Sequence, residues 1–163
     1  MRERPELHAE EILRRLTARG VDFVVIGGVA AVLWGSARLT YDLDICYATD
    51  NGNLDALGSV LIELGATLKG VDDDVPFIPD ARTLRHVELL TLNTMAGELD
   101  LLAHPAGGPT YDALRRRAAR VDIGEFHVLI ASLDDLILMK QAAGRKKDLA
   151  DVEELDAIRR LSR

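Results

Sequence analysis

The spacing of hydrophobic residues changes several times along the chain between that of helices and that of strands. Over residues 5–19, apolar residues recur at i, i+3, i+4 and i+7, which predicts an amphipathic helix that ends near Gly20. The apolar run at 22–26 predicts a buried strand. A short helix over 29–33 and a second strand over 41–47 follow it, so helix and strand alternate early in the chain.

The rest of the pattern mixes the two kinds of element. It predicts helices over 54–64, 111–118, 133–143 and 146–161. It predicts strands over 86–92 and 98–103, joined as a hairpin, and a short strand pair over 121–131. The stretch 66–82, which contains two prolines, is predicted to be a loop. This mixture favours an α/β (α+β) fold, with a mixed sheet flanked by helices and helices at the C-terminal end.

Length and composition predict a single domain over 1–163, with a core over about 20–131 and a helical part over about 132–163. Hydrophobic residues make up 48% of the chain and charged residues 29%, as in ordinary globular proteins. We expect no membrane partner, because no apolar run approaches the length of a membrane span. Cys46 is the single cysteine, which fits a reducing, cytoplasmic location.

The net charge of -7 argues against broad nucleic-acid binding by charge alone. A local basic surface is still compatible with the sequence, because Arg120 lies close to the run 115–117 of three arginines. Most such runs are solvated helix faces, so this feature is weak support for an RNA partner.

Asp42 and Asp44 are the most informative residues of the chain. Alternate residues of a strand face the same side, so the two carboxylates are expected side by side, about 7 Å apart along the strand. Neighbouring like charges are costly unless a cation or a proton neutralises them, and magnesium prefers carboxylate oxygens. The pair therefore predicts a divalent-metal site. The alternative is an edge strand with solvent-facing acids.

Gly27 and Gly28 lie 15 residues before this pair and directly follow the first predicted strand. A glycine turn before a helix lets backbone amides approach a phosphate group. The alternative is a tight strand-to-helix turn that binds no ligand. Together with the aspartates, the turn indicates nucleotide chemistry.

With these residues in place, the chain resembles the nucleotidyltransferase superfold that shares its core with DNA polymerase β. It is most similar to the small bacterial branch that includes the AbiEii and MenT toxins. The resemblance rests on residues 26–31, 34–35 and 38–45, and on a C-terminal group of charged residues from Lys140 to Asp151. It implies a nucleotidyltransferase-type mixed sheet, with magnesium on Asp42 and Asp44 and a third carboxylate from a later strand.

Asp100 is the carboxylate that fits the third position, because leucines flank it in a predicted strand where an unpaired charge would be costly. Glu98 is the alternative on the same strand face. Lys140 is expected to reach a phosphate, with an ordinary surface lysine as the alternative. Arg38 and Lys147 are candidate nucleotide-binding residues, although each also suits a structural ion pair.

One residue departs from the superfold pattern. Many members have a serine at the second position of the glycine turn, whereas this chain has Gly28. That departure puts a hydroxyl contact to the nucleotide in doubt, and backbone amides at the helix start are the expected replacement.

The resemblance implies metal-dependent transfer of a nucleoside monophosphate from an NTP to an acceptor hydroxyl, with two magnesium ions as cofactors. The catalytic residues would be Asp42, Asp44, Asp100 and Lys140. The acceptor implied by the toxin-like branch is the 3′ end of a tRNA, and a cognate antitoxin would be a protein partner. A small molecule such as an aminoglycoside, or a protein hydroxyl, is the alternative acceptor, and further acids in the cleft would favour the polycationic drug. A non-catalytic nucleotide- or partner-binding module of the same fold is the rival from another class.

Overall fold

The computed structural model describes residues 5–71 and 76–162, apart from the side chain of Lys147. Its strands are β1 (Phe23–Ile26), β2 (Asp42–Tyr47), β3 (Thr67–Leu68), β4 (Leu90–Thr94), β5 (Gly97–Leu102), β6 (Ala119–Ile123) and β7 (Phe126–Ile130). Its helices are α1 (Ala9–Ala18), α2 (Gly27–Trp34), α3 (Asn51–Glu63), α4 (Ala81–Arg85), α5 (Tyr111–Arg117), α6 (Leu133–Ala143) and α7 (Lys146–Leu161).

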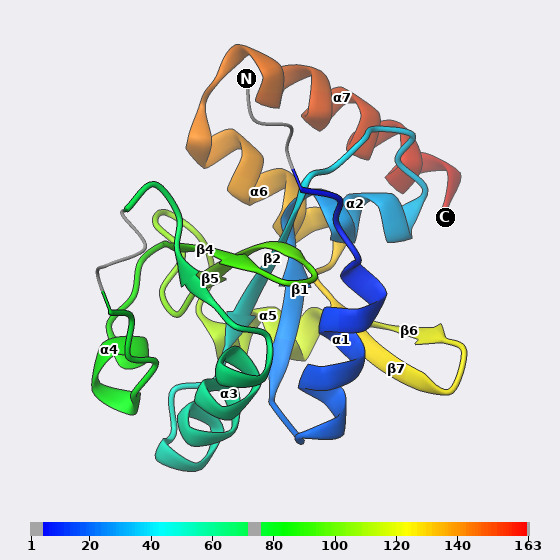
Figure 1. Ribbon diagram of the computed structural model, residues 1–163. Helices are drawn as coiled ribbons and strands as arrows, with labels where there is room; N and C mark the ends of the chain where they lie inside the picture. The colour runs from blue at the N-terminus through cyan, green and yellow to red at the C-terminus, as the bar shows by residue number, and fades with distance from the viewer. Residues whose placement is uncertain (1–4, 72–75, 163) are drawn as a thin grey trace.

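The strands of the described residues form one sheet in the order β3-β4-β5-β2-β1-β7-β6 (Figure 1). Strand β2 runs parallel to β5, and β1 runs parallel to β7. The other neighbouring pairs are antiparallel. The predicted mixed sheet flanked by helices is therefore confirmed. The central pair of β2 and β5 brings residues 42–46 beside 98–102, although these segments lie far apart in the sequence.

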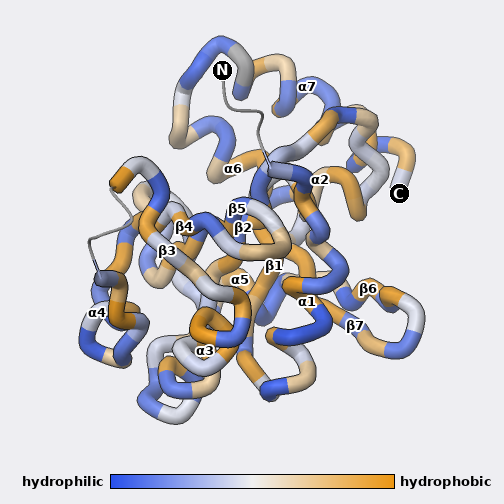
Figure 2. Tube along the Cα trace, viewed as in Figure 1, coloured by the Kyte–Doolittle hydropathy of each residue, from blue (hydrophilic) through white to orange (hydrophobic). Residues whose placement is uncertain are grey.

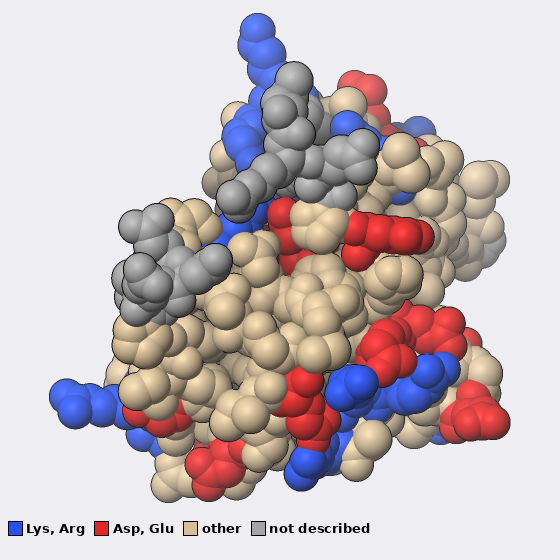
Figure 3. Space-filling model, viewed as in Figure 1, with Lys and Arg blue, Asp and Glu red and all other residues tan. Residues whose placement is uncertain are grey.

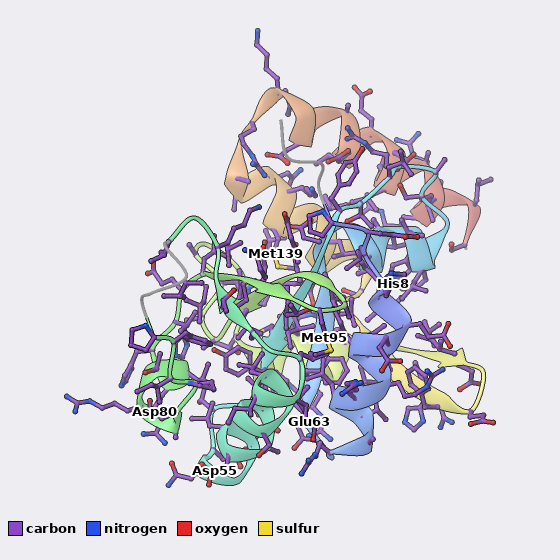
Figure 4. All side chains as sticks on the ribbon, viewed as in Figure 1. His8, Asp55, Glu63, Asp80, Met95 and Met139 are labelled. Carbon is purple, nitrogen blue, oxygen red and sulfur yellow. The ribbon has the colours of Figure 1, made fainter. Side chains whose placement is uncertain are left out.

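Helices cover the sheet because their apolar faces match its buried strands. All four residues of β1 are buried, and α1, whose buried residues are Ile12, Leu13 and Leu16, packs against the neighbouring strand β7 and against α3. Figure 2 shows hydrophobic residues along β1 and hydrophilic ones on the outer side of α1. Helices α1 and α3 are joined by ion pairs, since Glu63, labelled in Figure 4, pairs with Arg15 and with Arg19 at the end of α1. Over α1, the surface in Figure 3 accordingly mixes basic and acidic side chains.

Two contacts fix the helices that border the cleft described below. The indole Nε1 of Trp34, at the end of α2, donates to the carbonyl of Ala131 at 2.8 Å. Helices α6 and α7 pack side by side at the C-terminal end of the chain (Figure 1). Within the described residues, no helix has both the length and the apolar character that a membrane span requires.

The structure differs from the expected elements in five places, and the first is α1, which begins at Ala9 rather than at residue 5. Helix α2 begins at Gly27 rather than at residue 29. Helix α3 begins at Asn51, because the Asp50 side chain caps it by accepting from the Asn53 amide. The strand predicted at 86–92 is shifted to β4 (Leu90–Thr94), which leaves 86–89 outside the sheet. The predicted loop 66–82 contains β3 and α4, and its aspartates at 72–74 lie outside the described residues.

Candidate active site

Three carboxylates meet at the centre of the sheet. Asp44 on β2 is the direct register partner of Asp100 on the parallel strand β5, and Asp42 lies two residues earlier on the same face of β2. Each of the three offers a carboxylate oxygen, and these oxygens all lie within 4.8 Å of one another. The sheet thus gathers the three acids that the sequence analysis selected as metal ligands.

The electrostatics of this group favour binding of a cation. Burial, and then the charges of Asp42 and Asp100, raise the pKa of Asp44 well above its ordinary value, although the Lys140 ammonium acts in the opposite direction. Burial and the neighbouring Asp42 raise the pKa of Asp100 to about 6. Asp44 Oδ1 and Asp100 Oδ1 are buried and lack a hydrogen-bond partner among the described residues. Buried oxygens of this kind are costly unless a ligand satisfies them, so the donor set fits a hard divalent cation.

The raised pKa of Asp100 predicts a pH-dependent stability of the metal-free protein. The folded chain keeps this proton up to about pH 6, whereas the unfolded chain loses it near 3.8, so the stability linked to Asp100 is lost as the pH rises between these values. At pH 7, Asp100→Asn should therefore stabilise the metal-free protein by about 2–3 kcal/mol. Urea unfolding of both proteins across this pH range measures the difference.

The same experiment in excess magnesium is the control. A cation at this site needs ionised carboxylates, so magnesium should restore the stability of the original chain at pH 7 and leave Asp100→Asn almost unchanged. A stability difference that is constant from pH 4 to 7 would contradict the assigned charge state of Asp100.

The glycine turn touches the carboxylate group directly. Gly27 has a φ of +67°, a conformation that side-chain-bearing residues rarely adopt. A Cβ atom on Gly27 would overlap the Asp44 carboxylate. No side chain caps the start of α2, so the amides of its first turn are available to an anion in the cleft.

Helices α6 and α7 bring positive charge to the same place. The Lys140 ammonium lies 3.1 Å from Asp151 Oδ2 and 3.6 Å from Asp148 Oδ1. Arg38 also pairs with Asp151. Asp148 is almost fully buried and accepts from Arg145 at 2.8 Å; burial would raise its pKa, but the Arg145 hydrogen bonds hold the pKa below its usual value. These contacts hold Lys140 close enough for its positive charge to lower the pKa of Asp44.

A cleft of about 890 Å³ joins these parts. Seven of the eight site residues selected from the sequence line it: Gly27, Gly28, Arg38, Asp42, Asp44, Asp100 and Lys140. The eighth is Lys147, and its side chain lies outside the described part of the chain. Met139 of α6, labelled in Figure 4, also lines the cleft.

The comparison with known families decides the assignment. A family model described as "Nucleotidyltransferase of unknown function (DUF6036)" matches residues 7–163. The chain belongs to this nucleotidyltransferase family. A search of curated proteins found no match to the sequence.

Solved structures with the same fold include an antibiotic adenylyltransferase and a protein in complex with an adenylylated compound. The lincosamide antibiotic adenylyltransferase LnuA, bound to lincomycin, has a TM-score of 0.63 and 18% sequence identity, covering 94% of this chain and 99% of LnuA. ANT(2″)-Ia, in complex with adenylyl-2″-tobramycin, has a TM-score of 0.56 and 14% identity, covering 93% and 92% of the two chains. At these identities the likeness shows a shared fold.

The structure also bears on the alternative roles that the sequence suggested for Glu98 and Arg38. In the nucleotidyltransferase, Glu98 is buried and pairs with Lys69 at 3.0 Å, and it does not belong to the carboxylate group found among the described residues. Arg38 forms the structural ion pair that was its alternative role, while also lining the cleft.

Several lining residues of the nucleotidyltransferase were not expected from the sequence. Glu88 and Leu89 line the cleft because the strand begins at residue 90 rather than 86. Glu154 of α7 and Ser36 line it too, and the Ser36 hydroxyl donates to Glu154. Leu39 is 84% exposed in the same cleft. Leu39, an apolar residue next to Arg38, was a possible sequence signal for a binding surface. Only the fold shows that its segment meets the other segments that line the cleft.

Proposed function

We propose that this protein transfers a nucleoside monophosphate from an NTP to an acceptor hydroxyl, with two magnesium ions held by Asp42, Asp44 and Asp100. The observation that carries the proposal is the group of three carboxylates with two buried, unpartnered oxygens. When bound, magnesium would neutralise the phosphate charge and activate the attacking oxygen. The family assignment supports the same reaction class.

The protein residues would position the nucleotide and balance its charge. The backbone amides at Gly27 and Gly28 would donate to phosphate oxygens, since they open α2 at the edge of the cleft. Lys140 would offset negative charge on the outer phosphates. Arg38 and Lys147 would supply further positive charge for nucleotide binding. Asp100 would also orient the incoming hydroxyl. Such a reaction depends mainly on positioning and charge neutralisation.

The lining of the cleft favours a small acceptor with both apolar and cationic groups. Glu88 and Leu89 precede β4, on the far side of β5 from the glycine turn. Leu89 is 60% exposed there, and Tyr41 lines the same cleft. Exposed apolar side chains beside an acid suit a small amphipathic amine better than a polyphosphate chain.

A tRNA acceptor, as in a toxin with a cognate antitoxin, has less support from the surface. None of the four arginines at 115–117 and 120 is among the residues that line the cleft. Arg117 is engaged by Asp135 through two hydrogen bonds, and Arg120 pairs with Asp122. The tRNA hypothesis is therefore an outcome to test rather than the proposed function.

A labelling assay tests the proposed function. Purified protein with magnesium and each of the four α-labelled NTPs would be offered a lincosamide, an aminoglycoside, total tRNA and total protein in turn. We expect label in a small-molecule acceptor, and loss of labelling when EDTA is added. Label in tRNA or in protein would keep the reaction and change the acceptor.

Two other results of this assay would not support nucleotidyl transfer. No label with any acceptor, together with no magnesium-dependent thermal stabilisation by any NTP, would favour the non-catalytic binding module. Stabilisation without labelling would show an intact nucleotide site, which is the result expected both of a nucleotide-binding module and of an enzyme whose acceptor is absent from the panel.

A further inference from the structure

Gly28 and Thr40 both line the cleft and contact each other there, and this contact explains why residue 28 is a glycine. A Cβ atom added to Gly28 would lie 2.7 Å from Thr40 Oγ1 and 3.1 Å from Thr40 Cβ. Unlike Gly27, Gly28 is not among the residues with a positive φ, so its backbone would accept other residues. What requires glycine at this position is the space that the Thr40 side chain occupies.

The Thr40 hydroxyl consequently lies over the first turn of α2. This helix has eight residues and no side-chain cap at its N-terminus. Thr40, Gly27 and Gly28 all line the cleft that contains the aspartates. The hydroxyl donates to the carbonyl of Asp42 at 3.0 Å, and since a hydroxyl can rotate, its proton can turn toward a ligand in the cleft.

We infer that Thr40 is a nucleotide-binding residue whose hydroxyl donates to a phosphate oxygen held at the start of α2. This inference rests on the proposed function, because the phosphate comes from the NTP. The Thr40 hydroxyl and the first-turn amides would donate to the same phosphate group from two sides. A hydrogen bond to a charged group contributes about 1.5–3 kcal/mol, which corresponds to a 10- to 100-fold change in affinity.

Binding of magnesium complexes of ATP, GTP, CTP and UTP, measured by calorimetry, tests the inference. Thr40→Val keeps the shape that fills the space beside Gly28 but removes the hydroxyl, so we expect a 10- to 100-fold weaker Kd for the NTP that the original chain binds. Thr40→Ser keeps the hydroxyl and should bind within about threefold of the original chain. Thr94→Val is the matched control, because the Thr94 hydroxyl also donates to a nearby carbonyl, at 2.7 Å, but does not line the cleft.

A residue swap separates ligand binding from a structural role. Gly28→Ser alone should weaken binding, since its Cβ would press on Thr40. Thr40→Ala should weaken binding by losing the hydroxyl. When Gly28→Ser and Thr40→Ala are combined, the alanine removes the closest contact, the one with Thr40 Oγ1 at 2.7 Å, and leaves the contact with the Cβ of residue 40 at 3.1 Å. The serine then carries a hydroxyl close to the position that the Thr40 hydroxyl occupied. Affinity should then recover at least about tenfold over Thr40→Ala alone.

The outcomes are distinguishable. If Thr40→Val binds the NTP as tightly as the original chain, or if the valine and serine variants lose the same affinity, the inference is overturned while the proposed function stands. If Thr40 only holds the Asp42 carbonyl, Thr40→Val should lower the Tm as Thr94→Val does, without a change in Kd. If the original chain binds none of the four complexes, the proposed function itself fails.

Discussion

Asp44→Asn is expected to lower the rate of nucleotidyl transfer by about 1,000-fold. The substitution keeps the shape of the side chain but removes one of the three charges that would hold the metal. Loss of about 4 kcal/mol of transition-state charge stabilisation corresponds to this factor. The assay is the labelling reaction described above, run at saturating NTP and magnesium.

The same substitution should make the metal-free protein more stable. The pKa of Asp44 is raised well above its usual value by burial and by the charges of Asp42 and Asp100, so the stability linked to this carboxyl group is lost as the pH rises above that usual value. The neutral amide removes this repulsion, and the Tm without magnesium should rise by several degrees. Stabilisation by magnesium should disappear at the same time.

Asp122→Asn is the matched control for Asp44→Asn. Asp122 also lies on a strand, but it is exposed, pairs with Arg120 and does not line the cleft. Its replacement should change neither the rate nor the effect of magnesium. An Asp44→Asn protein that keeps more than a tenth of the original rate would show that this carboxylate is not required for the reaction.

Gly27→Ala is expected to be the most destabilising single substitution at the site. A left-handed conformation costs a residue with a side chain about 1–2 kcal/mol, and the new Cβ would also overlap the Asp44 carboxylate. Overpacking of this kind adds about 1–3 kcal/mol. Denaturant unfolding should therefore show a loss of about 2–5 kcal/mol.

Gly124→Ala separates the two contributions to that loss. Gly124 has nearly the same φ, +64°, but no atom lies within 4 Å of the position of its missing Cβ. Its replacement should cost only the backbone part, about 1–2 kcal/mol. Gly27→Ala should cost less in an Asp44→Ala chain than in the original chain, because the overlap with the carboxylate is removed and only the contact with the Cβ of residue 44, at 3.1 Å, remains. Equal losses for the two glycine variants would refute the close packing of Gly27 on Asp44.

Much of the fold was predictable because its elements carry strong local signals. The apolar run at 22–26 and the glycine after it define the start of the sheet, and the helices at the C-terminal end have clear caps such as Ser132. The metal-ligand candidates were predictable for a similar reason. Two acids at alternating positions of a strand indicate a metal site by themselves, whereas the third acid was expected from the resemblance to the superfold, and Asp100 between leucines fits that position.

The rest of the cleft depends on contacts that no local pattern contains. The alternation at 86–90 suits a strand, but pairing with β5 begins at Leu90, so Glu88 and Leu89 lie outside the sheet. The β3 strand has two residues and exists only through its pairing with β4. The relation of Gly28 to Thr40 is likewise visible only when the turn and the segment before β2 are brought together.

Trp34 gives this chain a built-in optical probe. It is the single tryptophan of the sequence, and it ends the same short helix that Gly27 and Gly28 begin. Its indole is partly buried and tied to the carbonyl of Ala131. A ligand that shifts the first turn of α2 would also shift Trp34, because the helix has only eight residues and Trp34 is the last of them. Intrinsic emission can therefore follow events at the glycine turn in real time, without a label and without an acceptor.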